Sequence, residues 1–441
     1  MHRPIDRLVD LLDPRLNQLY DVDIAEARRR VRAGDPAAVR AIDGSFAVVT
    51  IDGITVRMAR SLDRPMRYFL AKRQEGPALF VADRIDTLKR ALAEAGLDGQ
   101  FHPSYTRMVP AHYVVEISLV GCPDPDPLYT RYFTPERGTL PADLDEIGRR
   151  YISATAAEIE KWLLAVDRAG GGPIGVSFSG GIDSGAVFLL TYHTMLRLGM
   201  SPARLKAFVL NLGGGADVEQ ARAFLAPLGL ELFLEVIDGH PADLDVERTL
   251  AVLEDYKSLD VECAAMGLLL CQGIRARYPE WRHLADGDGG DENLKDYPIE
   301  DNPELTIRSV VNNMLLYHEG WGVGKIKHSL TYTGGLSRSY ARTYAPARQF
   351  GFEGFSPYTR PGVIEVAEAI PFVELTRYDV PTLYALKGEI VRRGVRAVAG
   401  IDMPVFPKRR FQHGTTSIDA MRARLGQSER DYRQTFERLY A

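Results

Sequence analysis

The spacing of apolar residues differs between the first third of the chain and the rest, which predicts two regions of different build. In the first region, short apolar or alternating runs indicate strands, and Asp52-Gly53 indicates a hairpin turn. These strands are expected at residues 45–51, 54–58, 67–71 and 78–82. Helical spacing adds helices at residues 24–42 and 87–95. We therefore expect this region to be α+β, with mostly antiparallel strands.

In the rest of the chain, apolar strands alternate with helices. The strands are expected at residues 173–178, 205–212, 231–237 and 282–285. The helices are expected at residues 147–166, 184–198, 217–228 and 261–278. This alternation predicts an α/β fold, in which a parallel sheet has helices on both faces. Ligands of such sheets bind at the carboxyl ends of the strands, and two glycine loops fall at such ends.

A proline-rich polar stretch separates the two regions. It runs through Pro123, Pro125 and Pro127 and is followed by Pro135 and Pro141. Stretches of this composition commonly border folded units. We place the boundary between residues 130 and 145, which gives a first domain at 1–137 and a second at 138–441.

Composition and charge narrow the class of protein. Of the 441 residues, 45% are hydrophobic and 26% charged, and the net charge is −5. This composition is ordinary for a globular protein and offers no electrostatic case for a nucleic-acid partner. The three cysteines have no metal-ligand spacing, and no apolar run is long enough to span a bilayer. A cytoplasmic protein without a membrane partner is expected.

The first glycine loop, Ser179–Ser184, follows a predicted strand and opens a predicted helix. Glycines let the backbone approach a ligand, and the free N–H groups at a helix start favour an anion. The hydroxyls of Ser179 and Ser184 add donors, and Asp183 can hold a hard cation beside phosphates. The alternative is a tight turn that only packs helix on strand; the whole hexapeptide favours the anion site.

The second glycine loop, Asp286–Glu292, follows the fourth predicted strand of this region. It carries four carboxylates in seven residues, which repel one another unless a cation compensates. Alone, such a loop is more often a solvated turn. Next to the first loop, it makes Asp183 and Asp291 candidates to share magnesium beside a pyrophosphate.

Both loops resemble those of a known family. Ser179–Ser184 resembles the pyrophosphatase loop of ATP-using synthetases, and Asp286–Glu292 is similar to the acidic loop of asparagine synthetases and β-lactam synthetases. In the first region, two segments resemble the class II glutaminase (Ntn-type) domain of asparagine synthetases, Asp43–Ala47 and Phe80–Ala82. Further similar segments are Phe208–Leu212, Glu353, Pro357-Tyr358 and Pro407–Phe411.

The resemblance implies an ATP pyrophosphatase-type fold and an AMP-forming ligase that uses ATP and Mg²⁺. It implies a base at Asp288, a stabilising cation at Lys408 and, by a loose alignment, a substrate contact at Arg342. Lys387 resembles another family lysine, but an ordinary surface residue is an equal reading. Metal ligands are expected at Asp183 and Asp291. The ATP-binding residues are expected to be Phe178, Ser179, Gly180, Gly181, Asp183, Ser184, Leu210 and Gly287.

Departures from the family pattern are informative. Class II glutaminases use an N-terminal cysteine, whereas residue 2 is His and the first cysteine is Cys122. Only about forty residues precede Asp43, so we expect a truncated domain that supports the fold and does not hydrolyse glutamine. At position 288, asparagine synthetases have Glu and β-lactam synthetases Tyr. Ser339 falls where asparagine synthetases place an acidic residue, which argues against aspartate as the substrate.

Three functions stay open on the sequence alone. The first is amide formation between a small-molecule or peptide carboxylate and a separate amine or ammonia. The second is intramolecular closure, as in the β-lactam synthetases or lasso-peptide cyclases that the chain also resembles. The third is a degenerate synthetase kept as a binding partner, against which the intact first loop and Asp291 argue. The sequence leaves the oligomeric state open, with a homodimer among the options.

Overall fold

The computed structural model describes residues 7–121, 126–297, 299–301, 306–312, 340–407 and 414–440. These residues form two compact units. The first is built around residues 7–134 with 433–440, and the second around 135–312 with 341–432. No described helix has the length and apolar character needed to cross a bilayer.

The first unit contains two four-stranded sheets, ordered β1-β7-β6-β8 and β10-β9-β5-β4. Neighbouring strands are antiparallel except β1 and β7, as the sequence predicted. The longer strands are β1 (Leu8–Asp10), β4 (Ala47–Asp52), β5 (Thr55–Arg60), β6 (Arg67–Ala71), β7 (Ala78–Ala82), β9 (Tyr113–Ser118) and β10 (Leu128–Arg131). Three two-residue strands complete the set, β2 (Gln18–Leu19), β3 (Gly44–Ser45) and β8 (Arg107–Met108).

The helix expected over residues 24–42 is two helices, α1 (Ile24–Ala33) and α2 (Pro36–Arg40). Gly34 ends α1 in the left-handed region with φ 72°, and Pro36 starts α2 with Asp35 as its cap. Proline cannot continue the first helix because its ring and missing N–H break the hydrogen-bond pattern. The next helix, α3 (Ile85–Glu94), lies two residues earlier than the prediction at its start.

Apolar side chains fill the first unit in two places. One cluster joins Val49 and Met58 of one sheet to Leu79 and Val81 of the other. A second joins the outer side of β6 and β7 to α3, through Phe80 and Leu88 among others, while α1 packs on β4 and β5. The unit is therefore layered helix, sheet, sheet, helix.

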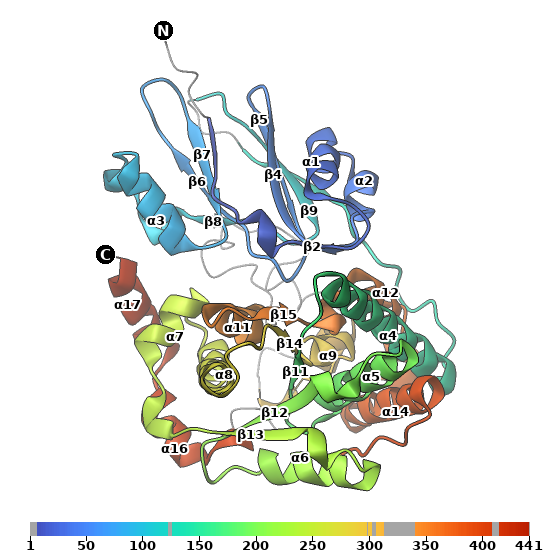
Figure 1. Ribbon diagram of the computed structural model, residues 1–441. Coiled ribbons are helices and arrows are strands. Elements are labelled where there is room, and N and C mark those ends of the chain that lie inside the picture. The colour runs from blue at the N-terminus through green and yellow to red at the C-terminus, as the bar shows by residue number, and fades with distance from the viewer. Residues whose placement is uncertain are drawn as a thin grey trace. The chain divides into compact units, whose positions relative to one another are not determined.

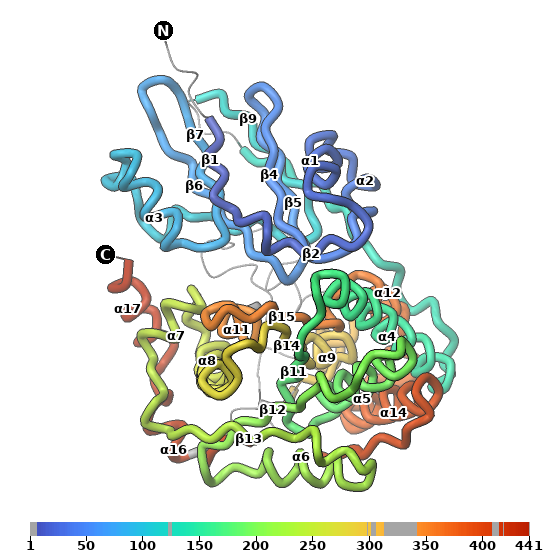
Figure 2. Tube along the Cα trace, viewed as in Figure 1, coloured from blue at the N-terminus to red at the C-terminus, as the bar shows by residue number. Residues whose placement is uncertain are grey.

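The second unit contains one parallel five-stranded sheet, ordered β13-β12-β11-β14-β15. Figures 1 and 2 show β11 in the middle of this sheet, between β12 and β14. The strand expected at 231–237 starts later, because residues 231–233 form a 3-10 turn. The strands are β11 (Ile174–Ser177), β12 (Leu205–Asn211), β13 (Leu234–Asp238), β14 (His283–Ala285) and β15 (Glu353–Phe355).

Twelve described helices belong to this unit together with the start of α17. The long ones are α4 (Leu144–Arg168), α5 (Ile182–Arg197), α6 (Asp217–Leu225), α7 (Val246–Leu253), α8 (Ser258–Arg277), α12 (Pro361–Glu368), α14 (Val380–Ala399), α16 (Ile418–Leu425) and α17 (Glu429–Tyr440). The short ones are α9 (Gly290–Asn293), α10 (Ile307–Asn312), α11 (Ala345–Gln349) and α13 (Phe372–Thr376).

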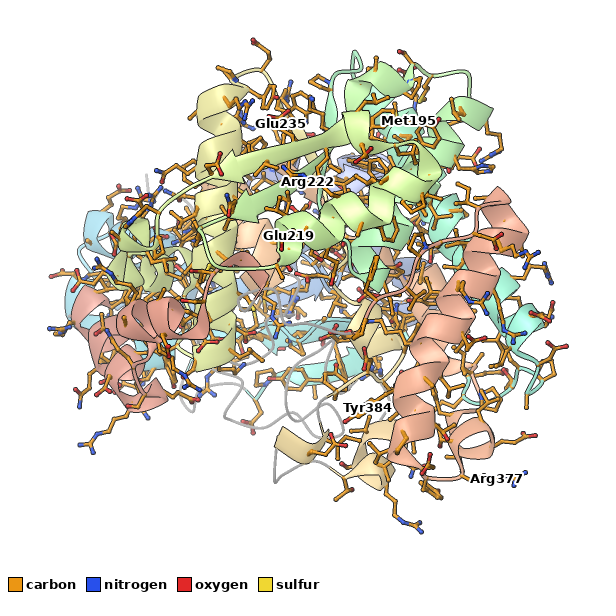
Figure 3. All side chains as sticks on the ribbon, turned by 90° about the horizontal axis from the view of Figure 1, so that it is seen from below. Met195, Glu219, Arg222, Glu235, Arg377 and Tyr384 are labelled. Atoms are coloured by element: carbon orange, nitrogen blue, oxygen red, sulfur yellow. The ribbon has the colours of Figure 1, made fainter. Side chains whose placement is uncertain are left out.

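Helices cover both faces of the sheet, which confirms the predicted fold class. Val176 and Val209 pack with α4, α5, α6, α12 and α14 on one face. Phe208 and Leu210 pack with α8, α11 and α16 on the other face. On the outside of α6, Glu219 and Arg222 are exposed, and Met195 of α5 is fully buried (Figure 3). Alternating strand residues thus reach two separate cores.

The strand order fixes where a ligand site can form. The chain runs from β11 to β12 and β13 in one direction and then crosses to β14 and β15 on the other side. The connections leave β11 and β14 in opposite directions, and ligands of open α/β sheets commonly bind at the carboxyl ends of two such strands. Both glycine loops follow these strands.

Candidate active site

The two glycine loops lie side by side because β11 and β14 are paired. Val176 pairs with Ala285 in the parallel register, so both strands end at the same level. A Cβ atom on Gly287 would lie only 2.6 Å from the backbone nitrogen of Ser184. Only glycine allows the second loop to approach the start of α5 so closely.

The first loop turns sharply at Gly180. Its φ of +71° lies in the left-handed region, and a Cβ atom there would be 2.9 Å from backbone atoms of Gln220 and Ala221. The Gln220 side chain donates a hydrogen bond to the Ser179 carbonyl at 3.2 Å. The loop is therefore held against α6 in one conformation.

The serines of the first loop form a small hydroxyl cluster at the start of α5. Ser179 and Ser184 place their hydroxyl oxygens 3.2 Å apart, and the Gly181 N–H donates to the Ser179 hydroxyl at 3.3 Å. Gly181 caps the helix without a side chain, so the first-turn N–H groups of α5 lack a side-chain acceptor from the cap. Hydroxyl donors and a helix start together suit a phosphate group.

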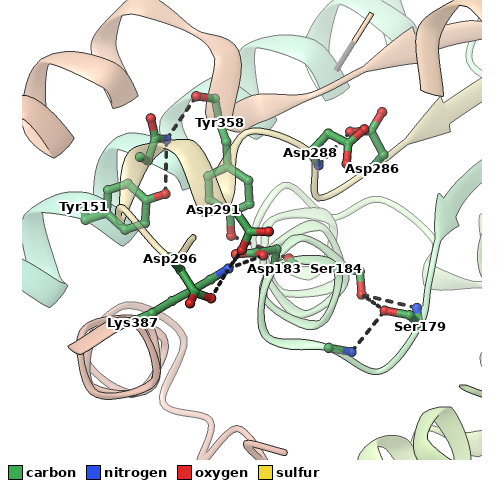
Figure 4. Close-up of polar contacts among 12 residues, drawn as sticks. Tyr151, Ser179, Asp183, Ser184, Asp286, Asp288, Asp291, Asp296, Tyr358 and Lys387 are labelled. Carbon is green, nitrogen blue, oxygen red and sulfur yellow. Dashed lines mark hydrogen bonds and ion pairs between the residues drawn. The ribbon is translucent and has the colours of Figure 1, made fainter. Parts of the chain in front are cut away.

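The second loop is anchored by Asp286. Its two carboxylate oxygens accept hydrogen bonds from the Ser356 hydroxyl at 2.6 Å, the Asp288 N–H at 2.9 Å and the Thr343 hydroxyl at 2.8 Å. Gly289 follows with φ +97°, and α9 begins at Gly290. Asp286 therefore fixes the loop, and Asp288 and Asp291 project from it (Figure 4).

Lys387 of α14 lies at the centre of the site. Its ammonium group forms ion pairs with Asp183 and Asp291 and lies 3.4 Å from an oxygen of Asp296 (Figure 4). Only 3% of its side chain is exposed. Burial alone would lower the pKa of this ammonium group, but the three carboxylates raise its pKa well above the ordinary value. Lys387 is therefore a buried, charged lysine.

The structure shows that Lys387 is not a surface residue, which was one of the two interpretations of the sequence. The spacing of apolar residues around Lys387 in the sequence already indicated a buried position for this lysine. Leu383, Ile390 and Gly394 are buried positions of α14, and Lys387 lies four residues after the first and three before the second. A lysine on the apolar stripe of an amphipathic helix needs a buried anionic partner. Asp296, which the sequence analysis did not name, follows α9 and had no such signal.

Two stacked tyrosines support this cluster from α4 and the segment after β15. The rings of Tyr151 and Tyr358 are 5.8 Å apart and nearly parallel. Asn293 donates hydrogen bonds to the Tyr151 hydroxyl at 3.2 Å and to the Tyr358 carbonyl at 3.0 Å. The tyrosines and Asn293 thereby connect α9 to α4 and fix the helix that carries Asp291 (Figure 4).

Asp288 and Arg342 interact electrostatically. Burial first, and then the charge of Asp286, raise the pKa of the Asp288 carboxyl well above its ordinary value, and Arg342 opposes the shift. Arg342 lies on a π-helical turn, Tyr340–Tyr344, and its Nε donates to Asp260 at 3.1 Å. Oδ2 of Asp288 and Nη2 of Arg342 are buried and have no hydrogen-bond partner among the described residues.

The carboxyl end of β12 lies next to that of β11 in the sheet, and that of β13 lies beyond it. Asn211 donates to Asp238 at 2.7 Å and accepts the Gly213 N–H at 3.1 Å. The Phe178 N–H donates to the carbonyl of Phe208, and the Leu210 side chain is buried in the core. The role of the backbone near Phe178 and Leu210 in nucleotide binding stays a prediction.

Some predicted positions lie elsewhere. Lys408 and Ser339 lie outside the described residues. The nearby C-terminal residues Thr415 and Thr416 bond to the loop after β12, through the Leu212 N–H and the Gly213 carbonyl. Glu353 pairs with Arg282 at 2.8 Å at the amino end of β15, away from the loops.

The donor set of the site fits a divalent cation. Asp183 and Asp291 both contact the ammonium group of Lys387, so oxygens of the two carboxylates lie close together. Carboxylate oxygens are the ligands that Mg²⁺ prefers, and phosphate oxygens commonly complete its shell. No cluster of three metal-binding side chains occurs among the described residues.

Comparison with known protein families identifies the region that holds this site. Residues 165–371 match the family model described as asparagine synthase. The match begins in α4 and includes both glycine loops, Arg342 and Tyr358.

Comparison with solved structures gives the crystal structure of an NAD+ synthetase from Burkholderia pseudomallei. The match has 19% sequence identity and a TM-score of 0.22, and it covers 54% of this chain and 89% of that chain. No curated protein matches the chain.

Proposed function

Residues 165–371 match the asparagine synthase family model, and from this match we propose that the chain is an ATP-dependent ligase that joins a carboxylate to an amine through an acyl-adenylate. The observation that supports this most is the meeting of the two glycine loops at Lys387. A hydroxyl-rich helix start, two converging carboxylates and a buried ammonium group suit a triphosphate and its cation.

In the first step, the substrate carboxylate attacks the α-phosphate of ATP, and pyrophosphate leaves. Ser179, Ser184 and the N–H groups at the start of α5 bind the β- and γ-phosphates. Lys387 stabilises the negative charge that grows on the pyrophosphate. When bound at Asp183 and Asp291, Mg²⁺ supplies further neutralisation of phosphate charge. The backbone near Phe178, Leu210 and Gly287 binds adenosine.

In the second step, an amine attacks the acyl carbon, and AMP leaves. Asp288 accepts the proton from the attacking nitrogen, a contribution of about 10²–10⁴ in rate. The raised pKa of its carboxyl makes it a better proton acceptor once it is ionised. Arg342, held by Asp260, binds an anionic group of the substrate. Lys408 stabilises the tetrahedral intermediate.

The amine does not come from glutamine in this proposal. It is free ammonia, a separate amine or an amine within the substrate, and the last case makes the protein a cyclase. The substrates are a small-molecule or peptide carboxylate and this amine. The two cases separate in one assay, because a cyclase forms product from ATP and a single substrate with no added amine.

The adenylation site is tested by pyrophosphate release over a panel of amino acids and small acids. Asp183→Ala and Asp291→Ala should each lower the rate by about a hundredfold or more, because the cation and Lys387 lose a carboxylate. The matched control is Glu219→Ala on the exposed face of α6, which should keep the wild-type rate. Wild-type turnover in either aspartate variant would contradict the assignment.

A further inference from the structure

A cavity of about 370 Å³ lies in the second unit, and the described residues that line it include none of the two glycine loops. Its walls come from the segment before α4, the residues after α9, the end of α10, the end of α12 and α13. We call it the Arg137 cavity. Its lining includes Arg137, Lys295, Val311, Glu368, Phe372 and Val373.

Two cations of the Arg137 cavity, Arg137 and Lys295, share one buried carboxylate, Glu368, and the exposed Glu374 balances the charge of the lining. Lys295 and Glu368 form a buried ion pair at 2.8 Å, with 4% of each side chain exposed. Arg137 lies 3.6 Å from the other oxygen of Glu368 and donates one hydrogen bond to the Val311 carbonyl at 3.2 Å. Its side chain is 41% exposed, so further guanidinium donors can reach a ligand. The other lining carboxylate, Glu374, is exposed to water.

The remaining walls of the Arg137 cavity are apolar. Val311 and Phe372 are buried, and Val373 leaves 39% of its surface exposed. Lys295 is strained, since its φ of +58° lies in the left-handed region that costs a side-chain-bearing residue about 1–2 kcal/mol. Such strain concentrates at functional sites. The volume also falls within the range of about 300–1,000 Å³ that is common for small-molecule sites.

We propose that the Arg137 cavity binds a small organic acid with an apolar body. The carboxylate of the ligand pairs with the guanidinium of Arg137, and its hydrocarbon part contacts Phe372 and Val373. The buried Lys295–Glu368 pair forms the polar floor. This site is separate from the proposed ligase chemistry and does not depend on it.

The Arg137 cavity shares one segment with the active site. Asp291 and Asp296 contact Lys387, whereas Lys295 between them contacts Glu368. A ligand that contacts Lys295 therefore restrains the same stretch of backbone that carries two active-site carboxylates. The amide protons of this stretch of backbone should exchange more slowly when the acid is bound.

The test is direct binding to the full chain without ATP. The probes are phenylacetate and 4-methylpentanoate, and the neutral control is phenylacetamide, each titrated by calorimetry. For probes of about ten non-hydrogen atoms we expect a Kd of about a millimolar or tighter. Phenylacetamide should bind at least about tenfold more weakly, because it lacks the charge that pairs with Arg137.

Two variants locate the site, and a third serves as a control. Arg137→Gln removes the guanidinium and Val373→Glu adds a negative charge at the rim; each should weaken phenylacetate binding by about tenfold or more. Neither removes the Lys295–Glu368 pair, and thermal unfolding of each variant checks the fold. Arg308→Gln on α10, where Arg308 stacks on Tyr378, should leave the affinity unchanged.

Hydrogen exchange provides an independent readout. Bound phenylacetate should slow exchange at residues 291–297 in the wild type and not in Arg137→Gln. The proposal is overturned if neither acid binds, if phenylacetamide binds as tightly as phenylacetate, if Arg137→Gln binds like the wild type, or if exchange at 291–297 is unaffected.

Discussion

Lys387 is the residue on which most of the active site converges. Three carboxylates surround one ammonium group that is almost fully buried. Without the lysine these carboxylates would repel one another in a poorly solvated place. In the proposed mechanism the lysine also acts in catalysis, so a substitution should lower both stability and activity.

Lys387→Met tests this double role. Removing one member of a buried ionic cluster leaves uncompensated charge, and we expect a loss of about 3–5 kcal/mol in the free energy of unfolding. Pyrophosphate release should also fall below detection. The double variant Lys387→Met with Asp296→Asn should recover part of the stability and none of the activity. Activity in either variant would remove Lys387 from the proposed first step.

Asp288 predicts a dependence of stability on pH. Burial and Asp286 raise the pKa of its carboxyl in the folded protein, so the folded state holds the proton more tightly than the unfolded state. Stability is then lost as the pH rises through the raised pKa. Asp288→Asn should raise the unfolding temperature at pH 7, and the gain should vanish below about pH 4, where the carboxyl is protonated in both states.

The same substitution separates the two half-reactions. Asp288→Asn should slow amide formation by about 10²–10⁴ and affect ATP–pyrophosphate exchange much less. In the wild type, amide formation should rise with pH through a pKa above the ordinary aspartate value, because the base must be ionised. If both half-reactions of the variant keep wild-type rates, another group is the base.

Sequence reasoning found the residues that belong to contiguous motifs. Ser179, Ser184 and Asp291 were predictable because each lies in a glycine loop at a strand end, and the structure brings these loops together. Asp260, which holds Arg342, and Asp296 come from separate segments without a motif. Their roles depend on how α8, α9 and α14 pack, which a local pattern does not encode.

At the level of elements, the packing of α4 against α14 sets the position of Lys387. The helices approach closely at Gly148 and Gly394. A Cβ atom at Gly148 would lie 2.6 Å from the Ile390 carbonyl oxygen, and one at Gly394 would overlap the Gly148 carbonyl. Two glycines therefore allow backbone contact between the helices. On α14 this contact lies within about two turns of Lys387.

Gly394→Ala should push these helices apart. Overpacking of this kind costs about 1–3 kcal/mol, and we also expect a higher KM for ATP because α14 carries Lys387. The matched control is Gly388→Ala in the same helix, where the nearest atom to the new methyl is 3.4 Å away on Val405. That change should stabilise the protein by up to about 1 kcal/mol and keep the KM.

The elements themselves were largely predictable, with errors at their ends. The break between α1 and α2 was missed because the apolar spacing continues across Gly34 and Pro36. The late start of β13 has a similar cause, since apolar residues also occur in the 3-10 turn before it. In both places the conformation of the backbone, and not the spacing of apolar side chains, determines where the element begins or ends.

At the level of the whole molecule, the first unit raises the question of glutamine use. Residues 7–121 contain no cysteine. Cys263 and Cys271 lie in α8 of the second unit, where burial raises the pKa of each thiol to about 12. Neither is therefore a thiolate nucleophile near neutral pH.

We expect no glutaminase activity from the purified protein. Glutamine should not replace an amine donor, and glutamate release should stay at the background rate, also in Cys122→Ser. The assay uses the carboxylate found in the pyrophosphate screen, with ammonium chloride as the comparison. Glutamate above background that disappears in Cys122→Ser would show that the expectation of a supporting, non-hydrolytic domain is wrong.

The pairing of β11 with β14 also has a consequence for how this protein matures. About a hundred residues of chain separate the two strands, so their contact forms late and only after a large loop has closed. A nascent chain that has folded β11 to β13 has the first glycine loop of the proposed triphosphate site and lacks the second. If the proposed site is correct, partly synthesised or partly unfolded molecules should not hydrolyse ATP, and turnover should begin only once β14 has paired with β11.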